Sequence, residues 1–176
     1  MADPRVAGYA EALFAVAAAE GDLSVVEDEL FRFAQALRSD DDLGSTLADR
    51  ALPMARRLQV VEDLLGARAS AVTTALVSMV VGAGRAAELP AIVDAMLERS
   101  AASRNKAVAT VRSAVDLTAD QRERLAAAIN TRTGREVEVR VVIDPSVLGG
   151  VVTEIGDDII DGSVRRRLNQ LRESFR

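Results

Sequence analysis

The residue types that most often carry out catalysis or hold metals are scarce in this sequence of 176 residues. It has no histidine and no cysteine, which excludes disulfides, thiol and histidine catalysis, and zinc sites built from these side chains. Serines and threonines are plentiful, but Lys106, the one lysine, lies in a polar stretch, and no evident base could activate a hydroxyl group. The sequence therefore predicts a protein that is not an enzyme.

Carboxylates are the other candidates for chemistry. Asp40, Asp41 and Asp42 form a run, but consecutive side chains point in different directions, whereas a calcium loop alternates its ligands and needs a central glycine and a distal glutamate. Acids at this place suit the positive end of a helix dipole. We therefore predict no metal site and no cofactor. Two carboxylates distant in sequence could still converge, so an acid-pair hydrolase is an alternative.

Nucleotide and nucleic-acid sites are also disfavoured. No Gly-x-x-x-x-Gly-Lys loop is present, and the glycine pair at Gly82 and Gly84 lacks the third glycine of a dinucleotide site. The net charge is −5 and aromatic residues make up only 3%, which leaves little for attracting or stacking nucleic acid. The basic cluster near the C-terminus is therefore interpreted as solvated or partner-facing; it consists of Arg165, Arg166, Arg167, Arg172 and Arg176.

The first part of the chain has helical periodicity throughout. Apolar residues recur three and four positions apart, and N-cap residues, prolines and glycines divide the stretch into six helices. The fifth is hydrophobic nearly all round, which is typical of a helix central to a bundle or covered by something else. The predicted helices lie between residues 3 and 21, at 23–37, at 41–49, between 53 and 66, between 70 and 82, and from 89 onward.

The second part mixes strands and helices. Residues 108–115 are rich in β-branched side chains and predict a strand, and Thr118 with Gln121 fits a capping box that begins a helix ending at Gly134. A further strand is predicted at 137–143, where one set of residues alternates with another as in a half-buried strand: Val137, Val139, Val141 and Ile143 with Glu136, Glu138, Arg140 and Val142. Others are predicted at 151–155 and around Ile159, with a helix after Ser163. The expected fold class is multi-domain, α followed by α+β: a six-helix bundle at 1–104 and a small mixed domain at 105–176.

Turn and strand residues near the C-terminus form the most specific pattern in the chain. An apolar residue and an aspartate precede a glycine pair, followed by Gly-Asp and then Asp-Gly-Ser-Val-Arg. The pattern closely resembles the signature of the delta subunit of rotary F-type ATP synthases, the bacterial counterpart of the mitochondrial oligomycin sensitivity-conferring protein. The residues that carry it are Ile143, Asp144, Gly149, Gly150, Gly156, Asp161, Gly162, Ser163, Val164 and Arg165. The N-terminal YAEALF and the Gly-Arg pair at Gly84 and Arg85 resemble the same family.

This resemblance implies a non-catalytic subunit of the peripheral stalk, or stator. The N-terminal bundle would bind the catalytic head of alpha and beta subunits, holding an N-terminal helix of an alpha subunit between its first and fifth helices. The C-terminal domain would bind the C-terminal helices of the b subunits. The protein would then couple rotary torque to ATP synthesis driven by protons or sodium ions. A stand-alone helical adaptor, unrelated to ATP synthase, is the alternative.

Two sets of apolar residues are candidate partner contacts. The groove for the alpha-subunit helix is predicted to be lined by residues of the first and fifth helices, although ordinary core packing would use the same positions. They are Tyr9, Leu13, Phe14, Val72, Leu76 and Met79. The C-terminal stripe faces either a b-subunit helix or the mixed domain itself; it consists of Val164, Leu168, Leu171 and Phe175.

No apolar run reaches the roughly 20 residues that a membrane span needs. The N-terminus also lacks the charged region and apolar core of a signal peptide. We therefore expect a protein on the cytoplasmic side of the cell membrane, attached peripherally through the ATP synthase complex and without direct insertion.

Overall fold

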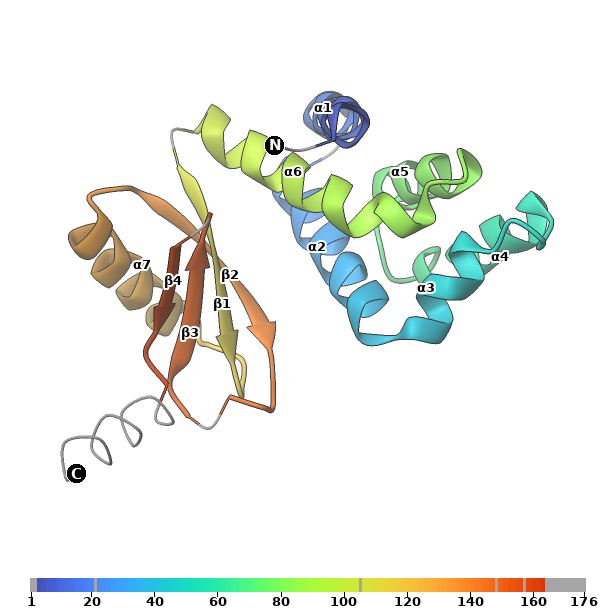
Figure 1. Ribbon diagram of the computed structural model, residues 1–176. Helices are drawn as coiled ribbons and strands as arrows, with labels where there is room; N and C mark the ends of the chain where they lie inside the picture. The colour runs from blue at the N-terminus through green and yellow to red at the C-terminus, as the bar shows by residue number, and fades with distance from the viewer. Residues whose placement is uncertain (1–2, 21, 105, 148, 157, 164–176) are drawn as a thin grey trace. The chain divides into compact units, whose positions relative to one another are not determined.

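The computed structural model describes residues 3–20, 22–104, 106–147, 149–156 and 158–163. The chain divides after Ser100 into two compact units, Met1–Ser100 and Ala101–Arg176 (Figure 1). The boundary expected from the sequence, residue 104, lies one position past the end of the helix that leads into the second unit.

The first unit is helical, and aspartates cap two of its helices. Asp22 accepts a hydrogen bond from the Ser24 N–H at 3.1 Å, and Asp40 accepts one from the Leu43 N–H at 3.0 Å, so each aspartate satisfies a free donor of the helix that follows. The elements are α1 (Pro4–Glu20), α2 (Leu23–Ser39), α3 (Asp41–Ala48), α4 (Met54–Leu65), α5 (Ala71–Gly82), the 3-10 turn η1 (Ala86–Glu88) and α6 (Leu89–Ser103).

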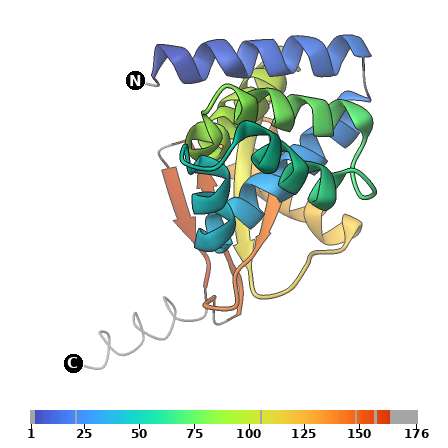
Figure 2. The same ribbon diagram turned by 90° about the vertical axis from the view of Figure 1, so that its right-hand side faces the viewer.

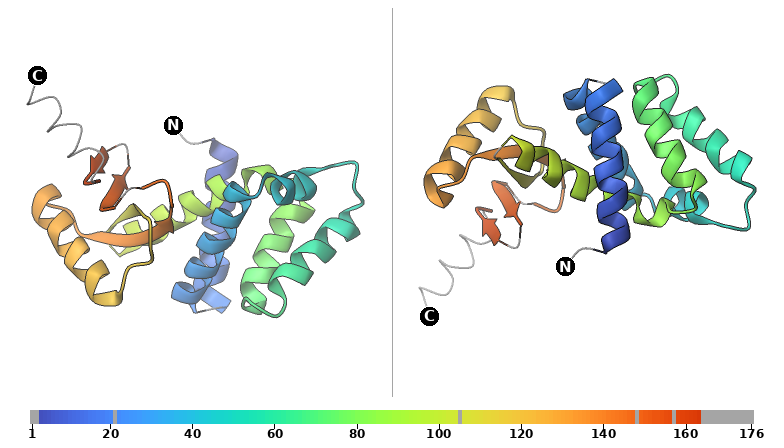
Figure 3. Two further views of the ribbon diagram at one scale, coloured as in Figure 1. Left: turned by 90° about the horizontal axis from the view of Figure 1, so that it is seen from below. Right: turned by 90° about the horizontal axis from the view of Figure 1, so that it is seen from above.

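Helix α5 packs against α1, α2 and α4, which explains why it is apolar nearly all round. Seen from above, α1 and α4 lie on either side of it (Figure 3), and α1 runs along the upper edge of the helical unit in Figure 2. Of the two alternatives left open for this helix, a place between other helices of the bundle is the one observed. Every other α-helix of the unit also contributes large apolar side chains that are fully buried: Leu13, Val26, Leu30, Leu47, Val61, Leu89, Ile92 and Met96.

In its described residues, the second unit is a mixed sheet with one helix, α7, packed on it. The strands are β1 (Ala107–Ser113), β2 (Val137–Ile143), β3 (Val151–Ile155) and β4 (Asp158–Asp161), in the order β2-β1-β3-β4. Strands β1 and β2 are parallel and joined through α7 (Ala119–Thr133), while the other two pairs are antiparallel. Helix α7 covers a core of Ala109, Ile129, Val137 and Ile155. The predicted fold class, helices followed by a mixed strand and helix unit, is confirmed.

The alternation expected along β2 is only partly observed. Ile143 belongs to the face expected to be buried but is 60% exposed, because the core under α7 forms at the other end of the strand. Arg140, expected on the solvent side, is only 8% exposed and pairs with the Glu138 carboxylate. The strand itself was predicted correctly, while the burial of its two faces was not.

Candidate functional site

The C-terminal signature forms the junction between β2, β3 and the chain after β4. Asp144 closes β2: its N–H donates to the Ser113 carbonyl at 2.8 Å, and its carboxylate accepts from the Ser146 N–H at 2.9 Å. Hydrogen bonds from the Ser146 hydroxyl and N–H, with the nearby charge of Arg112, hold the pKa of the Asp144 carboxyl below its usual range. The signature aspartate therefore stays ionised as a turn anchor.

The glycines of the signature bring two backbone segments into close contact. Gly149 and Gly150 have φ values of 72° and 76°, a left-handed conformation that favours glycine. The Gly162 N–H then donates to the Val151 carbonyl at 2.9 Å, and the Ser163 N–H donates to the Asp161 carboxylate at 2.9 Å. The segment after β4 is thereby tied to the start of β3.

A surface cavity of about 160 Å³ lies at this junction. It brings together the signature residues Asp144, Asp161 and Ser163 with Arg112 of β1, which donates to the Glu154 carboxylate at 2.5 Å. Sequence reasoning missed Arg112; the only signal was its place on the side of the predicted strand opposite the core. Asp144 lies in the turn after β2 and Asp161 lies at the end of β4, and no lysine lines the cavity. We therefore interpret the signature residues here as a structural junction between strands.

The end of the signature and the whole predicted stalk contact lie beyond the part of the chain that the structure describes. Val164 and Arg165 of the signature, and the stripe of Val164, Leu168, Leu171 and Phe175, lie outside the described residues. Ile143 is exposed at the end of β2, and Gly156 has a φ of 57° between β3 and β4. The b-subunit contact stays a prediction.

The six residues predicted for the alpha-subunit groove lie on two helices that touch each other, α1 and α5. Leu13 and Leu76 are 1% and 3% exposed and belong to the core. Tyr9, Phe14 and Val72 are half-buried, and Met79 is 43% exposed. Leu13 and Leu76 therefore belong to the packed interior, while the other four side chains are partly or largely accessible to solvent.

Arginines cover the two aromatic rings of α1. The guanidinium carbon of Arg85, on the turn after α5, lies 5.3 Å from the centroid of the Tyr9 ring, and that of Arg99, on α6, lies 5.3 Å from the centroid of the Phe14 ring. Because Tyr9 and Phe14 are five residues apart, their directions differ by about 140° around the helix. They flank the buried stripe of α1 on opposite sides.

The beginning of α5 is fixed by a carboxylate from α2. Glu29 accepts hydrogen bonds from the Ser70 N–H at 3.0 Å, the Ser70 hydroxyl at 2.9 Å and the Thr73 hydroxyl at 2.6 Å. Ser70 itself caps α5 by accepting from the Thr73 N–H at 3.2 Å. Although burial alone raises the pKa of the Glu29 carboxyl, the hydrogen bonds from Thr73 and Ser70 outweigh it and hold this pKa below its usual range.

This network predicts a pH-dependent contribution to stability. Since the pKa of Glu29 is lower in the folded protein, its stabilisation is complete above the unfolded-state pKa near 4.5 and is lost as pH falls through the folded-state value. At pH 7 we expect Glu29→Gln to lower the free energy of unfolding by about 1 kcal/mol. Urea denaturation at pH 7 and pH 3 measures this, with the exposed Glu98→Gln as control. An equal deficit at both pH values would contradict the assignment.

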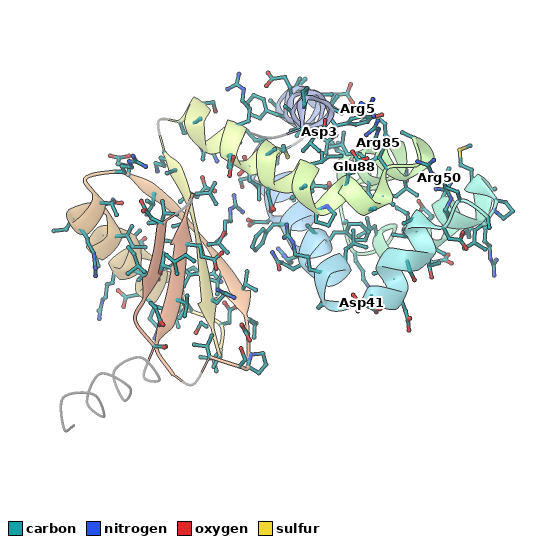
Figure 4. The ribbon with its side chains drawn as sticks, in the orientation of Figure 1. Asp3, Arg5, Asp41, Arg50, Arg85 and Glu88 are labelled. Carbon is teal, nitrogen blue, oxygen red and sulfur yellow. The ribbon has the colours of Figure 1, made fainter. Side chains whose placement is uncertain are left out.

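The aspartate run predicted to favour a helix start does begin α3. Asp40 is its N-cap, and Asp41 and Asp42 lie in its first turn, with Asp41 labelled in Figure 4. The described part of the chain holds no group of three or more acidic side chains placed to bind a metal ion. Among the helices of that same part, none is long and apolar enough to cross a bilayer.

Comparison with known proteins identifies relatives along the whole chain. Residues 6–175 match the family model of the ATP synthase delta (OSCP) subunit. The ATP synthase subunit delta of Nocardia farcinica is 44% identical over 175 residues, which cover 99% of this chain and 65% of the relative. That of Salinispora tropica is 39% identical over 164 residues, covering 93% of this chain and 60% of the relative. The chain therefore spans less than two thirds of the length of these relatives.

A solved structure shares the fold. One chain of the Toxoplasma gondii mitochondrial ATP synthase hexamer, determined by cryo-EM, superposes with a TM-score of 0.59, covering 98% of both chains at 24% sequence identity. At this identity the likeness concerns the fold alone. It extends over the helical unit and the mixed unit, since both chains are covered almost completely.

Proposed function

Because this chain belongs to the ATP synthase delta (OSCP) subunit family, we propose that it is a non-catalytic stator subunit of an F-type ATP synthase. In this role it links the catalytic head of alpha and beta subunits to the b subunits of the peripheral stalk. Rotary torque is then resisted by the stalk and used for ATP synthesis on other subunits. The family match gives no support to the acid-pair hydrolase or to an unrelated helical adaptor.

We propose that each unit binds a different partner. The helical unit holds the N-terminal helix of an alpha subunit, and the mixed unit, together with the stripe of Val164, Leu168, Leu171 and Phe175, binds the C-terminal helices of the b subunits. The subunit is peripheral, on the cytoplasmic side of the cell membrane. This division corresponds to the domains 1–104 and 105–176 expected from the sequence.

The observation that carries the proposal is the accessible apolar surface of α1 and α5. Tyr9, Val72 and Met79 reach this surface, and Leu13 and Leu76 lie buried beneath it as support. We call the surface formed by Tyr9, Val72 and Met79 the guest-helix surface. An amphipathic helix that places apolar anchors on such a surface is a common mode of recognition. Phe14, on the other flank of α1, is assigned to packing under Arg99.

Met79→Asp is expected to weaken binding of the alpha-subunit helix without unfolding the protein. Met79 is exposed, so the new charge meets water in the free protein, but it would be buried without a partner in the complex. We expect the Kd for a peptide of the alpha-subunit N-terminus to rise at least about tenfold, as is usual for an interface anchor. Isothermal titration calorimetry measures this.

The matched control is Val25→Asp, because Val25 of α2 is 42% exposed, nearly the same as Met79. It should bind the peptide as the unchanged protein does. Equal Kd values for Met79→Asp and the unchanged protein would remove Met79 from the surface. Absence of any peptide binding by the unchanged protein would refute the proposed role of the helical unit.

A further inference from the structure

The turn after α5 contacts the chain's single tyrosine, Tyr9 of α1, through the side chain of Arg85. Arg85 lies over the Tyr9 ring at 5.3 Å, and its guanidinium also donates to the Glu88 carboxylate at 2.6 Å. A cation within about 6 Å of a tyrosine ring is attracted to its face, more strongly when it is partly shielded from water. The side chain of Arg85 is only 22% exposed. The contact therefore restrains Tyr9 from one side while the ring stays half-buried.

The backbone geometry at the end of α5 fixes the position of the Arg85 main chain. Gly84 has a φ of 73° and donates its N–H to the Val81 carbonyl at 2.9 Å, and the Arg85 N–H donates to the Val80 carbonyl at 3.1 Å. These are the two hydrogen bonds of a Schellman motif, which ends a helix in one defined geometry. Arg85 is thus placed by α5 and Tyr9 by α1, so their contact joins the two helices of the guest-helix surface.

We infer that Arg85 is a positioning residue of the guest-helix surface, holding the Tyr9 ring in the orientation that a bound helix meets. The inference rests on the proposed function above. A ring already fixed in the free protein loses less rotamer freedom on binding, and that loss commonly opposes association. Arg85 acts through Tyr9, and its pairing with Glu88 keeps its own charge satisfied.

The charges around the ring define the chemistry of the anchor that fits it. Arg85 is balanced by Glu88, and the start of α1 carries one charge of each sign, Asp3 just before the helix and Arg5 in its first turn (Figure 4). The Asp3 carboxylate is engaged with the Arg5 N–H at 2.9 Å. With no net charge at this end of the surface, the guest residue that meets Tyr9 is a large apolar side chain rather than an acid.

The opposite flank of α1 provides a matched control. Arg99 lies over the Phe14 ring at the same distance of 5.3 Å and pairs with Glu11 at 2.8 Å. Arg85→Gln and Arg99→Gln therefore each remove one guanidinium stacked on an aromatic ring of α1 and one ion pair, with Glu88 and with Glu11 respectively. Only Arg85→Gln removes a stacked guanidinium from a residue of the guest-helix surface, Tyr9.

The experiment uses the full chain and a peptide of the alpha-subunit N-terminus in which any tyrosine or tryptophan is replaced by phenylalanine. Tyr9 is then the sole fluorophore, because the chain has one tyrosine and no tryptophan. For Arg85→Gln we expect a Kd about tenfold higher, which corresponds to about 1.4 kcal/mol, and a lower fluorescence anisotropy of Tyr9 before the peptide is added. Arg85→Lys should recover part of both effects, and Arg99→Gln should leave both unchanged.

A double-mutant cycle keeps the inference testable if a single variant perturbs folding. The Kd of the combined Tyr9→Leu and Arg85→Gln protein should be close to that of Tyr9→Leu alone, because Arg85 acts through the ring. Additive losses, or a Kd for Arg85→Gln equal to that of the unchanged protein, would overturn the positioning role and leave the proposed function intact. If the unchanged protein did not bind the peptide, the proposed function would fail first and this inference with it.

Discussion

Gly150→Ala is expected to lower the free energy of unfolding of the second unit by about 4 kcal/mol, from the left-handed backbone and the overpacking together. Gly150 has a φ of 76°, and an added Cβ would lie 2.6 Å from the Gly162 carbonyl oxygen and 3.1 Å from the Ser163 Cα atom. Both obstacles are backbone atoms, which cannot rotate away as a side chain can. The two segments would have to separate, with loss of the hydrogen bond from the Gly162 N–H to the Val151 carbonyl.

Gly134→Ala is the control, because it tests a left-handed backbone conformation without a steric clash. Gly134 ends α7 with a φ of 68°, but nothing lies within 4 Å of its added Cβ, so we expect a loss of only about 1 kcal/mol. Hydrogen exchange followed by mass spectrometry should show reduced protection in the strands of the second unit for Gly150→Ala. Equal protection in the two variants would show that the crossing at Gly150 relaxes easily.

The same geometry explains why a long pattern was visible in the sequence. Each signature residue taken singly fits an ordinary turn, but Gly150 and Gly162 lie at one crossing of two segments, with Asp144 and Asp161 anchoring turns beside it. Where two backbone segments pass this close together, the residue types at several positions are constrained at once, although these positions are separated in sequence. That joint constraint is what made this stretch more specific than any other part of the chain.

Local signals predicted most of the fold. The N-cap at Ser70, the capping box at Thr118 and the stop at Gly134 all lie where their short-range hydrogen bonds require them. The burial of β2 could not be predicted in this way, because alternation shows that a strand has two faces but not how far a helix covers either one. Arg140 and Ile143 were therefore assigned to the wrong environments.

The guest-helix surface shows a second limit of sequence patterns. A helical period identifies the apolar side of α1 and α5, but Leu13 and Leu76 at its centre pack inward while Met79 at its margin is exposed. Residues at the centre and at the margin of this apolar side recur with the same helical period, so only tertiary packing distinguishes the buried ones from the exposed one. Contacts between distant segments, such as Arg85 with Tyr9 or Glu29 with Ser70, leave no trace in local spacing.

Arg57→Ala is expected to lower the free energy of unfolding of the first unit by about 3 kcal/mol, because a buried charged group and the hydrogen bonds it makes are removed together. Arg57 of α4 is only 7% exposed and donates to the Val81 carbonyl at 3.2 Å and the Leu47 carbonyl at 3.4 Å. These carbonyls belong to the last turns of α5 and α3, where the helix dipole favours a cation, and the Val81 carbonyl accepts from Arg57 as well as from the Gly84 N–H.

Two further variants identify which property of Arg57 matters. Arg57→Met keeps most of the apolar stem but no donors, so it should lose about half as much as Arg57→Ala if packing and hydrogen bonding contribute comparably. Arg56→Ala is the control, because Arg56 is the exposed neighbour on the same helix. Urea denaturation followed by the fluorescence of Tyr9, the single tyrosine, reports on the first unit. Equal midpoints for Arg57→Ala and Arg56→Ala would contradict a role for the buried guanidinium, and α3, α4 and α5 would then be held together by their apolar contacts alone.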